Sequence, residues 1–534
     1  MAQHAQTPTS EASEWDGAHF AKEQSSGVVL GLNLRQVIIA GTGIGLGMVF
    51  IIAGGAPTGL ILAVIVVLLA AGLAIPKVQG VPVADWIVAL IRHGVQGSRG
   101  QLSYVQADSY DEVGEPSAGV LSASDQVEDA QRRDKKGRII PGRGWRFQLP
   151  GEAGELLAYE LPGGAGFCYD PRTGEGMVSA KIMTSKGFAL ESFDSQEERT
   201  GHWRDGLTAV ANLPGVLRIQ CSDQTTLISG SRIQRFYESR VEDTVASGGK
   251  AGAEVDPFLH AGLEDLMTEA QDMPVHEMWL TVVLSKEKLG KRIKVLGGGL
   301  SGFMEIALKL MSTIEGVLPP SGTQVVSWHS PRSLAGLSRS AFDPDSSVMI
   351  SERSASWVGA SPSQAGPMAL DVFVSHLATD GYLHRVYKVS EFPQRQARLG
   401  FLDAFVFSGE FRHTVTVYYL PGDLRKAKAR VGGRKATWTT SDRMLTKLDR
   451  PPSLEHQREW DDIEAEEAEL VDGHAPLDVA AFVVVTGKDE LELEANCADL
   501  LGRAVQANCE LRVLYAEQGS GMLAAGLPFG WIKR

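Results

Sequence analysis

Cysteine and net basic charge are scarce in this chain, and each shortage excludes a class of protein. Four cysteines in 534 residues rule out a scaffold held together by disulfides. Acidic residues outnumber basic ones, 65 against 51, which argues against a surface that binds nucleic acid as a whole. With 43% apolar and 22% charged residues, the chain as a whole has globular proportions, unlike a disordered chain or a protein built mainly of membrane-spanning segments. Its length allows about three or four folded units.

The motifs of nucleotide chemistry are also missing. No GxxxxGK[ST] loop occurs, so the usual nest of backbone N–H groups for phosphates is absent from the sequence. Gly297, Gly299 and Gly302 match a GxGxxG fingerprint, but the segment before them is short and basic. No acidic residue about twenty positions farther on ends a second strand to hold a ribose. We interpret these glycines as a turn that starts a helix.

Metal and nucleophile signatures are equally incomplete. His276 and Glu277 begin an HExxH string, but Leu280 occupies the second histidine position. No GxSxG turn marks a nucleophilic serine. The sequence therefore predicts no catalytic, cofactor-binding or metal-binding residue, and a protein that is not an enzyme. The cysteines are too far apart to form a metal site and are interpreted as core residues: Cys168, Cys221, Cys497 and Cys509.

A charge-free window from Gln36 to Pro76 is the strongest compositional feature. It divides at Gly54 to Pro57 into two apolar runs, each near the roughly 17-residue lower limit for a membrane-spanning helix. Basic residues flank the window and the turn is uncharged, which places both ends in the cytoplasm. The window predicts a transmembrane hairpin in a multi-pass protein of the inner or plasma membrane, with both termini cytoplasmic. A buried hairpin in a soluble core is the alternative.

Glycines line the first apolar run at small-xxx-small spacing, which allows a neighbouring helix to approach closely. They are Gly41, Gly43, Gly45 and Gly47. Packing against the alanine-rich second run is favoured over a contact between subunits.

The whole chain divides by composition and periodicity, and its fold class is predicted as α+β or α/β with cytosolic ferredoxin-like modules after the hairpin. The expected parts are a disordered tail (1–33), the hairpin with a juxtamembrane helix (34–105), a charged linker (106–142), a first α/β module (143–245), a second α/β module (253–436), a charged helical connector (437–475) and a C-terminal β-α-β module (476–534).

Local patterns support this division. Thr379-Asp380-Gly381-Tyr382 is a two-residue hairpin signal. Ser195 and Glu198 match a capping box at the start of a helix. In the last module we expect a strand over Val479–Thr486, a helix over Glu490–Asn508 and a strand over Glu510–Tyr515.

A dense basic cluster lies between Arg425 and Lys435, and an acidic stretch follows between Glu459 and Asp472. The acidic stretch is predicted to be an exposed connector, because so many carboxylates are costly to bury. The basic cluster is either a solvated helix face or a contact with DNA or an acidic partner, and the sequence leaves its role open. We expect no direct sequence-specific binding of nucleic acid.

Particular segments resemble parts of conjugation machines. Residues Arg35 to Tyr104, which contain GVPVADWIVALIR from Gly80 to Arg92, resemble the PrgI-type membrane domain of conjugation systems in Gram-positive bacteria. Tyr382 to Pro421 and Glu464 to Gly530 are similar to the region that precedes the motor domain in VirB-type conjugation ATPases. The order of parts resembles a family of actinobacterial integral membrane proteins encoded with such secretion machines.

The resemblance implies a membrane-anchored scaffold or adaptor of a type IV-like secretion system. Its partners would be the lipid bilayer, a separate motor ATPase and other subunits of an oligomeric assembly. Two alternatives stay open: an E-type subunit of type VII secretion and a membrane-attached enzyme. Apolar residues near the C-terminus are predicted either to dock the motor or to fold back on the chain's own sheet: Leu523, Leu527, Phe529 and Trp531.

Overall fold

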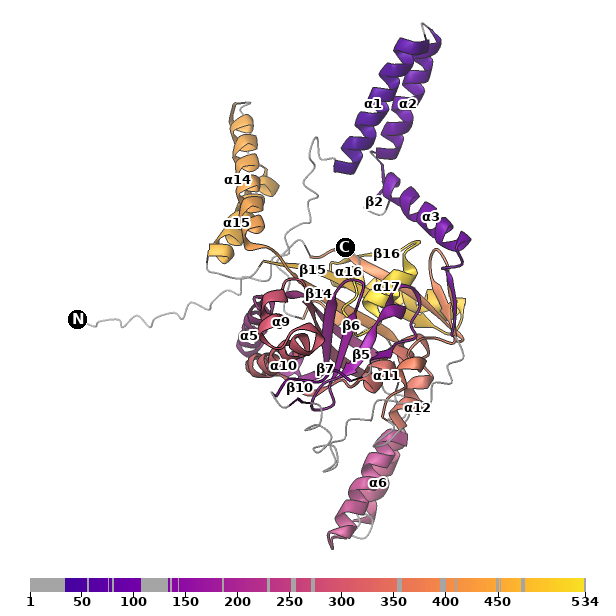
Figure 1. The fold of residues 1–534 in the computed structure, drawn as a ribbon, viewed down its shortest axis with the longest axis vertical. Coiled ribbons are helices and arrows are strands. Elements are labelled where there is room, and N and C mark those ends of the chain that lie inside the picture. Colours follow the sequence, from indigo (N-terminus) through magenta and orange to yellow (C-terminus); the bar gives the residue numbers. More distant parts are fainter. Residues whose placement is uncertain are drawn as a thin grey trace, which may run out of the picture.

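A computed structural model gives the fold as a mixed α+β structure built on a large antiparallel sheet (Figure 1). This confirms the coarser part of the predicted fold class. The predicted tail and most of the predicted linker lie outside the described residues. The structure describes residues 34–54, 57–74, 76–78, 81–106, 133–134, 137–142, 144–184, 187–227, 231–250, 256–269, 274–352, 358–393, 400–407, 409, 411–447, 451, 453–471 and 476–532.

Two apolar helices at the N-terminal end of the described chain pack against each other and stand away from the sheet (Figure 1). They are α1 (Leu34–Gly54) and α2 (Thr58–Ala74), followed by β1 (Lys77–Val78), β2 (Val81–Pro82) and α3 (Val83–Ser98). The Gln36 side chain donates to the Ala74 carbonyl at 2.6 Å. A Cβ atom on Gly43 would lie 2.2 Å from the Cβ of Ala70. Gly43 and Gly47 therefore pack on α2, as the favoured alternative predicted, whereas a Cβ atom on Gly41 or Gly45 would meet no atom within 4 Å.

The prediction of a multi-pass membrane protein with both termini in the cytoplasm is wrong. Among the described residues, Gln36–Gly54 is the one helix long and apolar enough to cross a membrane, with a mean hydropathy of 2.2. Helix α2 is shorter, with 17 residues.

The strands lie in the order β3-β11-β12-β13-β15-β14-β8-β9-β7-β6-β5-β4, with β10 paired to β7 and β16 paired to β13. Their bounds are β3 (Ser103–Val105), β4 (Trp145–Arg146), β5 (Leu157–Glu160), β6 (Gly166–Asp170), β7 (Glu175–Thr184), β8 (Val216–Leu227), β9 (Pro274–Ser285), β10 (Thr323–Trp328), β11 (Ala369–Val372), β12 (Leu377–Thr379), β13 (Tyr382–Glu391), β14 (His413–Pro421), β15 (Leu477–Gly487) and β16 (Glu510–Val513).

Two groups of four strands repeat one connectivity. The strands β7 to β10 lie in the spatial order β10-β7-β9-β8, and β13 to β16 lie in the order β16-β13-β15-β14. Helices α5 (Phe193–Ala211) and α10 (Gly299–Val317) connect outer to central strands in the first repeat, as α13 (Asp403–Val406) and α16 (Glu490–Gln506) do in the second. The repeats join where β8 pairs with β14, with Cys221 opposite Val417. The first repeat draws its strands from both of the predicted α/β modules.

Each repeat carries a helical arm between its second and third strands. The α6–α8 arm consists of α6 (Ser231–Ala246) and α8 (Pro257–Glu269), and the α14–α15 arm of α14 (Leu424–Lys447) and α15 (Leu454–Val471). Figure 1 shows the α14–α15 arm projecting on the same side of the sheet as α1, whereas α6 projects at the opposite end. The predicted charged connector thus forms part of a protruding arm.

Both faces of the sheet are covered. Helices α5 and α10 bury one face of the first repeat around Phe303, and α13 and α16 bury the corresponding core of the second around Phe405. The opposite face packs against Phe342 at the end of α11 (Pro331–Phe342) and against α17 (Gln518–Ala525). Successive side chains of a strand point to opposite faces of the sheet, so Tyr418 lies in one core and Tyr419 in the other. The described residues also form α9 (Gly290–Val295), α12 (Ser346–Glu352) and short 3-10 helices, among them η1 (Gly151–Glu155) and η4 (Pro319–Ser321).

Several local predictions are confirmed and one is shifted. Thr379 pairs with Tyr382 across the β12–β13 turn, where Asp380 and Gly381 have φ values of 28° and 96°. The predicted C-terminal β-α-β order appears as β15, α16 and β16. Helix α5 begins earlier than predicted, because Ser192 rather than Ser195 is its N-cap and accepts from the Ser195 backbone N–H.

Candidate functional site

The end of the described chain crosses the junction of the two repeats, and we call residues Gln518–Trp531 the C-terminal strap. It comprises α17 and the segment after it. Leu527 and Phe529 are 0% and 1% exposed, and the Phe529 ring lies 5.1 Å from the Phe147 ring. Of the two alternatives for the terminal apolar residues, folding back on the chain's own sheet is confirmed. Leu523 is buried as well, and Trp531 is half-buried beneath Arg172.

Polar side chains of the sheet hold the strap by its backbone. Tyr418 and Thr416 of β14 donate to the carbonyls of Ala524 and Ala525 at 2.7 and 2.6 Å. On the first repeat, Gln220 donates to the Leu527 carbonyl at 2.8 Å. A buried carbonyl without a partner costs about 1–3 kcal/mol, so these donors make burial of an irregular segment feasible. The strap therefore bridges β14 of one repeat and β8 of the other.

An ion pair and a glycine hold the far end of the strap. Arg218, 4% exposed, donates to the Gly530 carbonyl and forms an ion pair with Glu175 of β7. The Gly530 backbone N–H donates to the Gln220 side chain at 2.6 Å. Gly530 has a φ of 61°, and a Cβ atom there would lie 2.4 Å from Val283. Both the conformation and the close packing require glycine at this position.

The near end of the strap is fixed by one glutamine. The buried Gln518 side chain accepts from the Val386 backbone N–H at 2.8 Å and donates to the Val386 carbonyl at 3.2 Å. It thereby takes the place of a neighbouring strand beside β13. A period-two polar pattern in β8, Gln220-x-Ser222-x-Gln224, is the sequence signal that marks this face, which the predicted site residues do not include.

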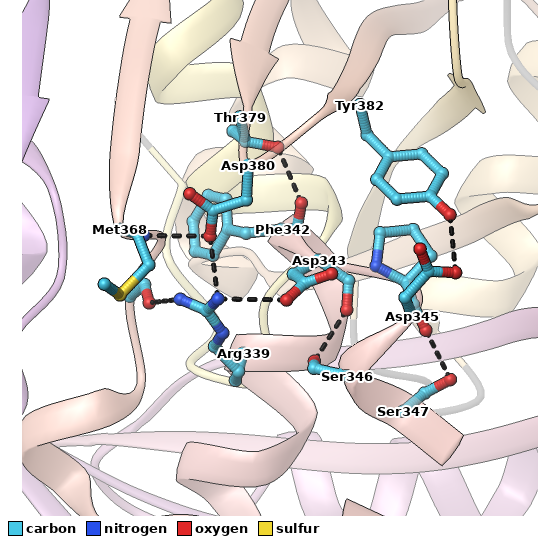
Figure 2. Close-up of polar contacts among 12 residues, drawn as sticks. Arg339, Phe342, Asp343, Asp345, Ser346, Ser347, Met368, Thr379, Asp380 and Tyr382 are labelled. Carbon is cyan, nitrogen blue, oxygen red and sulfur yellow. Dashed lines mark hydrogen bonds and ion pairs between the residues drawn. The ribbon is translucent and has the colours of Figure 1, made fainter. Parts of the chain in front are cut away.

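A second polar cluster ties α11 to the β12–β13 turn. Figure 2 shows the Arg339 side chain between Asp343 and Asp380, and each carboxylate lies 2.9 Å from its guanidinium. Asp380 also accepts from the backbone N–H groups of Met368 and Ala369. Both carboxylates are thus paired with the Arg339 guanidinium, which also donates to the Gly366 carbonyl at 2.8 Å. The cluster is therefore a structural joint.

Tyr382 extends the same joint toward the sheet. Its hydroxyl donates to Asp345 at 2.7 Å (Figure 2). Burial, and then the hydrogen bond to Asp345, raise the pKa of Tyr382, so the hydroxyl keeps its proton. Burial lowers the pKa of nearby Arg412 to about 10, which leaves it a cation at neutral pH. It offsets part of the acidic charge of the joint.

His384 lies under this joint and is held neutral. Its ring nitrogens lie 2.7 Å from the Thr379 hydroxyl and 2.9 Å from the Thr486 hydroxyl. Burial lowers the pKa of His384 to about 3, from 6.5 for an exposed histidine. Because the unfolded chain binds the proton first, His384 contributes stability above pH 6.5 that is lost as the pH falls toward 3.

We expect the His384→Gln variant to show a flatter dependence of the free energy of unfolding on pH. The difference in slope should approach about 1.4 kcal/mol per pH unit between the two pKa values. Denaturant titrations of both proteins from pH 7 to pH 4 measure it. Parallel pH profiles would contradict the prediction, even if the variant were uniformly less stable, because a constant offset reports on packing alone.

The glycine fingerprint is a turn between helices. Gly297 and Gly299 have φ values of 114° and 57° and connect α9 to α10, so a helix and not a strand precedes the motif. A Cβ atom on Gly302 would lie 2.3 Å from the Ile293 carbonyl oxygen. The glycines are required by a left-handed turn and a close helix contact. This confirms the interpretation of the motif as a turn that starts a helix.

The other sequence candidates have structural partners. His276 and Glu277 lie on strand β9, where they pair with Asp223 and Lys181, each at 2.8 Å. The hydrogen bond to Asp223 raises the pKa of His276. No group of three His, Cys, Asp or Glu side chains suited to a metal occurs among the described residues. All four cysteines are free: Cys168, Cys497 and Cys509 are buried, and Cys221 is half-buried.

The basic cluster between Arg425 and Lys435 lies on α14 and faces the acidic helix α15. Arg430 and Arg434 both contact Glu466, and Lys435 contacts Glu467 at 2.6 Å. Exposed ion pairs contribute little each, but a network of them sets how two helices lie together. The acidic stretch thus neutralises part of the basic cluster within one arm.

No family model matches this chain, and no curated protein matches it. The likeness to conjugation proteins therefore remains a prediction from the sequence.

Proposed function

We propose that this protein is a membrane-attached scaffold or adaptor of a conjugation-type, type IV-like secretion machine, which docks a separate motor ATPase and is not itself an enzyme. The observation that carries the proposal is the pair of helical arms that leave a sheet fastened by its own strap. A rigid platform with protruding helices suits a protein that holds others in place. The resemblance of the sequence to conjugation proteins is the basis for naming a type IV-like secretion machine.

Each repeat is proposed to be a ferredoxin-like module. Its elements run β-α-β-β-α-β, and its strands lie in the order fourth, first, third, second. Both arms are then insertions at the same place of the module, between its second and third strands. A fold gains docking elements at such a place without change to its core.

Membrane attachment is proposed to occur through α1. Its outward side chains are apolar and exposed in the isolated chain, with Ile52 at 84% and Met48 at 61%. Such a surface is costly in water and favourable in lipid.

The α14–α15 arm is the proposed docking element for the motor. Met444 and Leu454 are 66% and 73% exposed on this arm, and both flank the turn between its helices. Apolar side chains at the tip of a charged arm favour contact with a second protein. The arm projects on the α1 side, where components held at a membrane would gather (Figure 1).

The strand register provides a sharp test of this docking. Pro421 pairs directly with Leu477, so residues 424–471 can be replaced by a short glycine-serine link without opening the sheet. Full-length protein is extracted in mild detergent, and the co-purifying chains are identified by mass spectrometry. We expect a motor ATPase with the full chain and its loss from the armless variant.

The matched control replaces residues 231–269 in the same way, because Leu227 pairs directly with Pro274. It should retain the ATPase. An ATPase that stays with the α14–α15 deletion, or none with the full chain, would overturn the docking proposal. Labelled ATP bound by the purified chain alone would overturn its non-enzymatic part.

A further inference from the structure

No described residue of the chain occupies a groove on the first repeat. It lies beside α9 and α10 at the start of β8 and the end of β9, and encloses a cavity of about 430 Å³. Its lining is largely apolar and includes Val295, Leu296 and Ile306, and it also carries three cations, Lys291, Arg292 and Lys309, which we call the cationic rim. No acidic residue lines it. This α9–α10 groove therefore suits an apolar surface with acidic residues at its border.

Helix α8 presents such a surface. Phe258, Leu259 and Leu266 are 85%, 66% and 62% exposed, and the helical period places them on one side of α8 together with Leu263. Asp265 is exposed beside this apolar side. The other side of the helix contacts α6 at His260, whose ring nitrogen lies 2.7 Å from the Tyr237 hydroxyl.

Within one chain, α8 lies too far from the α9–α10 groove to occupy it. The arm leaves the sheet at Leu227 and Pro274, whereas the groove lies at the opposite ends of the same two strands, beside Leu284. Ten residues of strand span about 33 Å. A bilayer is a poor occupant for α8, because α6 projects at the end of the molecule opposite α1 (Figure 1).

We propose that α8 of one copy occupies the α9–α10 groove of a second copy of this chain. The apolar side of α8 would lie on Val295 and Ile306, with Asp265 near the cationic rim. The two surfaces differ, so each copy offers one groove and one arm. Such a head-to-tail contact builds a ring or a filament. The inference goes beyond the proposed function and holds with or without a docked motor.

The oligomeric state of the full chain in detergent micelles tests the contact. Mass photometry should detect assemblies larger than the 57.4 kDa of one chain. We expect single chains for the arm variant Phe258→Asp/Leu266→Asp and for the groove variant Lys291→Glu/Lys309→Glu. The matched controls, Val245→Asp on α6 and Lys294→Glu on α9, change exposed residues that lie outside the two surfaces and should assemble like the unaltered chain.

Mixing the two variants distinguishes a head-to-tail contact from other interfaces and from misfolding. The arm variant keeps an intact groove and the groove variant keeps an intact arm, so the mixture should form pairs that cannot grow further. A monomeric unaltered chain, variants that assemble normally, or a mixture that stays monomeric would each overturn the proposal. Co-purification of the motor is a separate measurement, so its failure and that of self-assembly are distinguishable.

Discussion

Replacement of Phe529 by alanine is expected to lower the free energy of unfolding by about 3–5 kcal/mol, the range for a large aromatic side chain lost from a packed core. Phe529 of the strap is 1% exposed, and its ring packs against the ring of Phe147. The loss falls on a segment that joins both repeats, so the whole sheet should melt at a lower temperature. Denaturant titration and thermal unfolding measure the effect.

Phe193→Ala is the matched control, because Phe193 is 53% exposed at the start of α5. It should leave stability almost unchanged. If Phe529→Ala kept full stability and instead released a bound partner, the strap would be a docking surface and its packing on the sheet would be wrong.

Arg218→Met is expected to cost a similar amount, about 3–5 kcal/mol, because removal of one partner leaves a buried charge without compensation. Glu175 would lose its cation and the Gly530 carbonyl its donor. Arg204→Met provides the control, since Arg204 pairs with Asp205 on the surface, where both side chains are 62% exposed. A surface pair contributes about 0–1 kcal/mol.

A double variant separates the ion pair from the contact with the strap. Glu175→Leu together with Arg218→Met should recover part of the loss, because no buried charge then stays unpaired. The remaining loss measures the hydrogen bond to Gly530. Equal stability of Arg218→Met and the unaltered protein would show that the strap does not depend on this arginine.

The strap contacts both repeats, so their stabilities are coupled. Gln518 contacts β13, Thr416 and Tyr418 belong to β14, and Gln220 belongs to β8. A change that loosens one end therefore alters the junction at which the repeats meet. Under the proposed function, a partner docked on one arm would thereby be positioned relative to the other arm, as a scaffold requires.

Local order was readable from the residues because it depends on neighbours in the chain. The Asp380-Gly381 turn follows from backbone conformations that few residues adopt, and Val415-x-Val417 alternates as a strand with one face in the core. The free cysteines and the glycine turn before α10 also agree with their local patterns. The start of α5 was misjudged, since a competing serine cap three residues earlier decided it.

By itself, the sequence determined the elements, the charge-free N-terminal window and the missing phosphate loop, since each depends on residue types at short spacing. The tertiary structure alone decided that two similar strand groups join through β8 and β14, that acidic α15 faces basic α14, and that the terminal apolar residues return to the sheet. These outcomes depend on contacts between residues far apart in the chain, such as Gln220 and Leu527, which no local periodicity encodes.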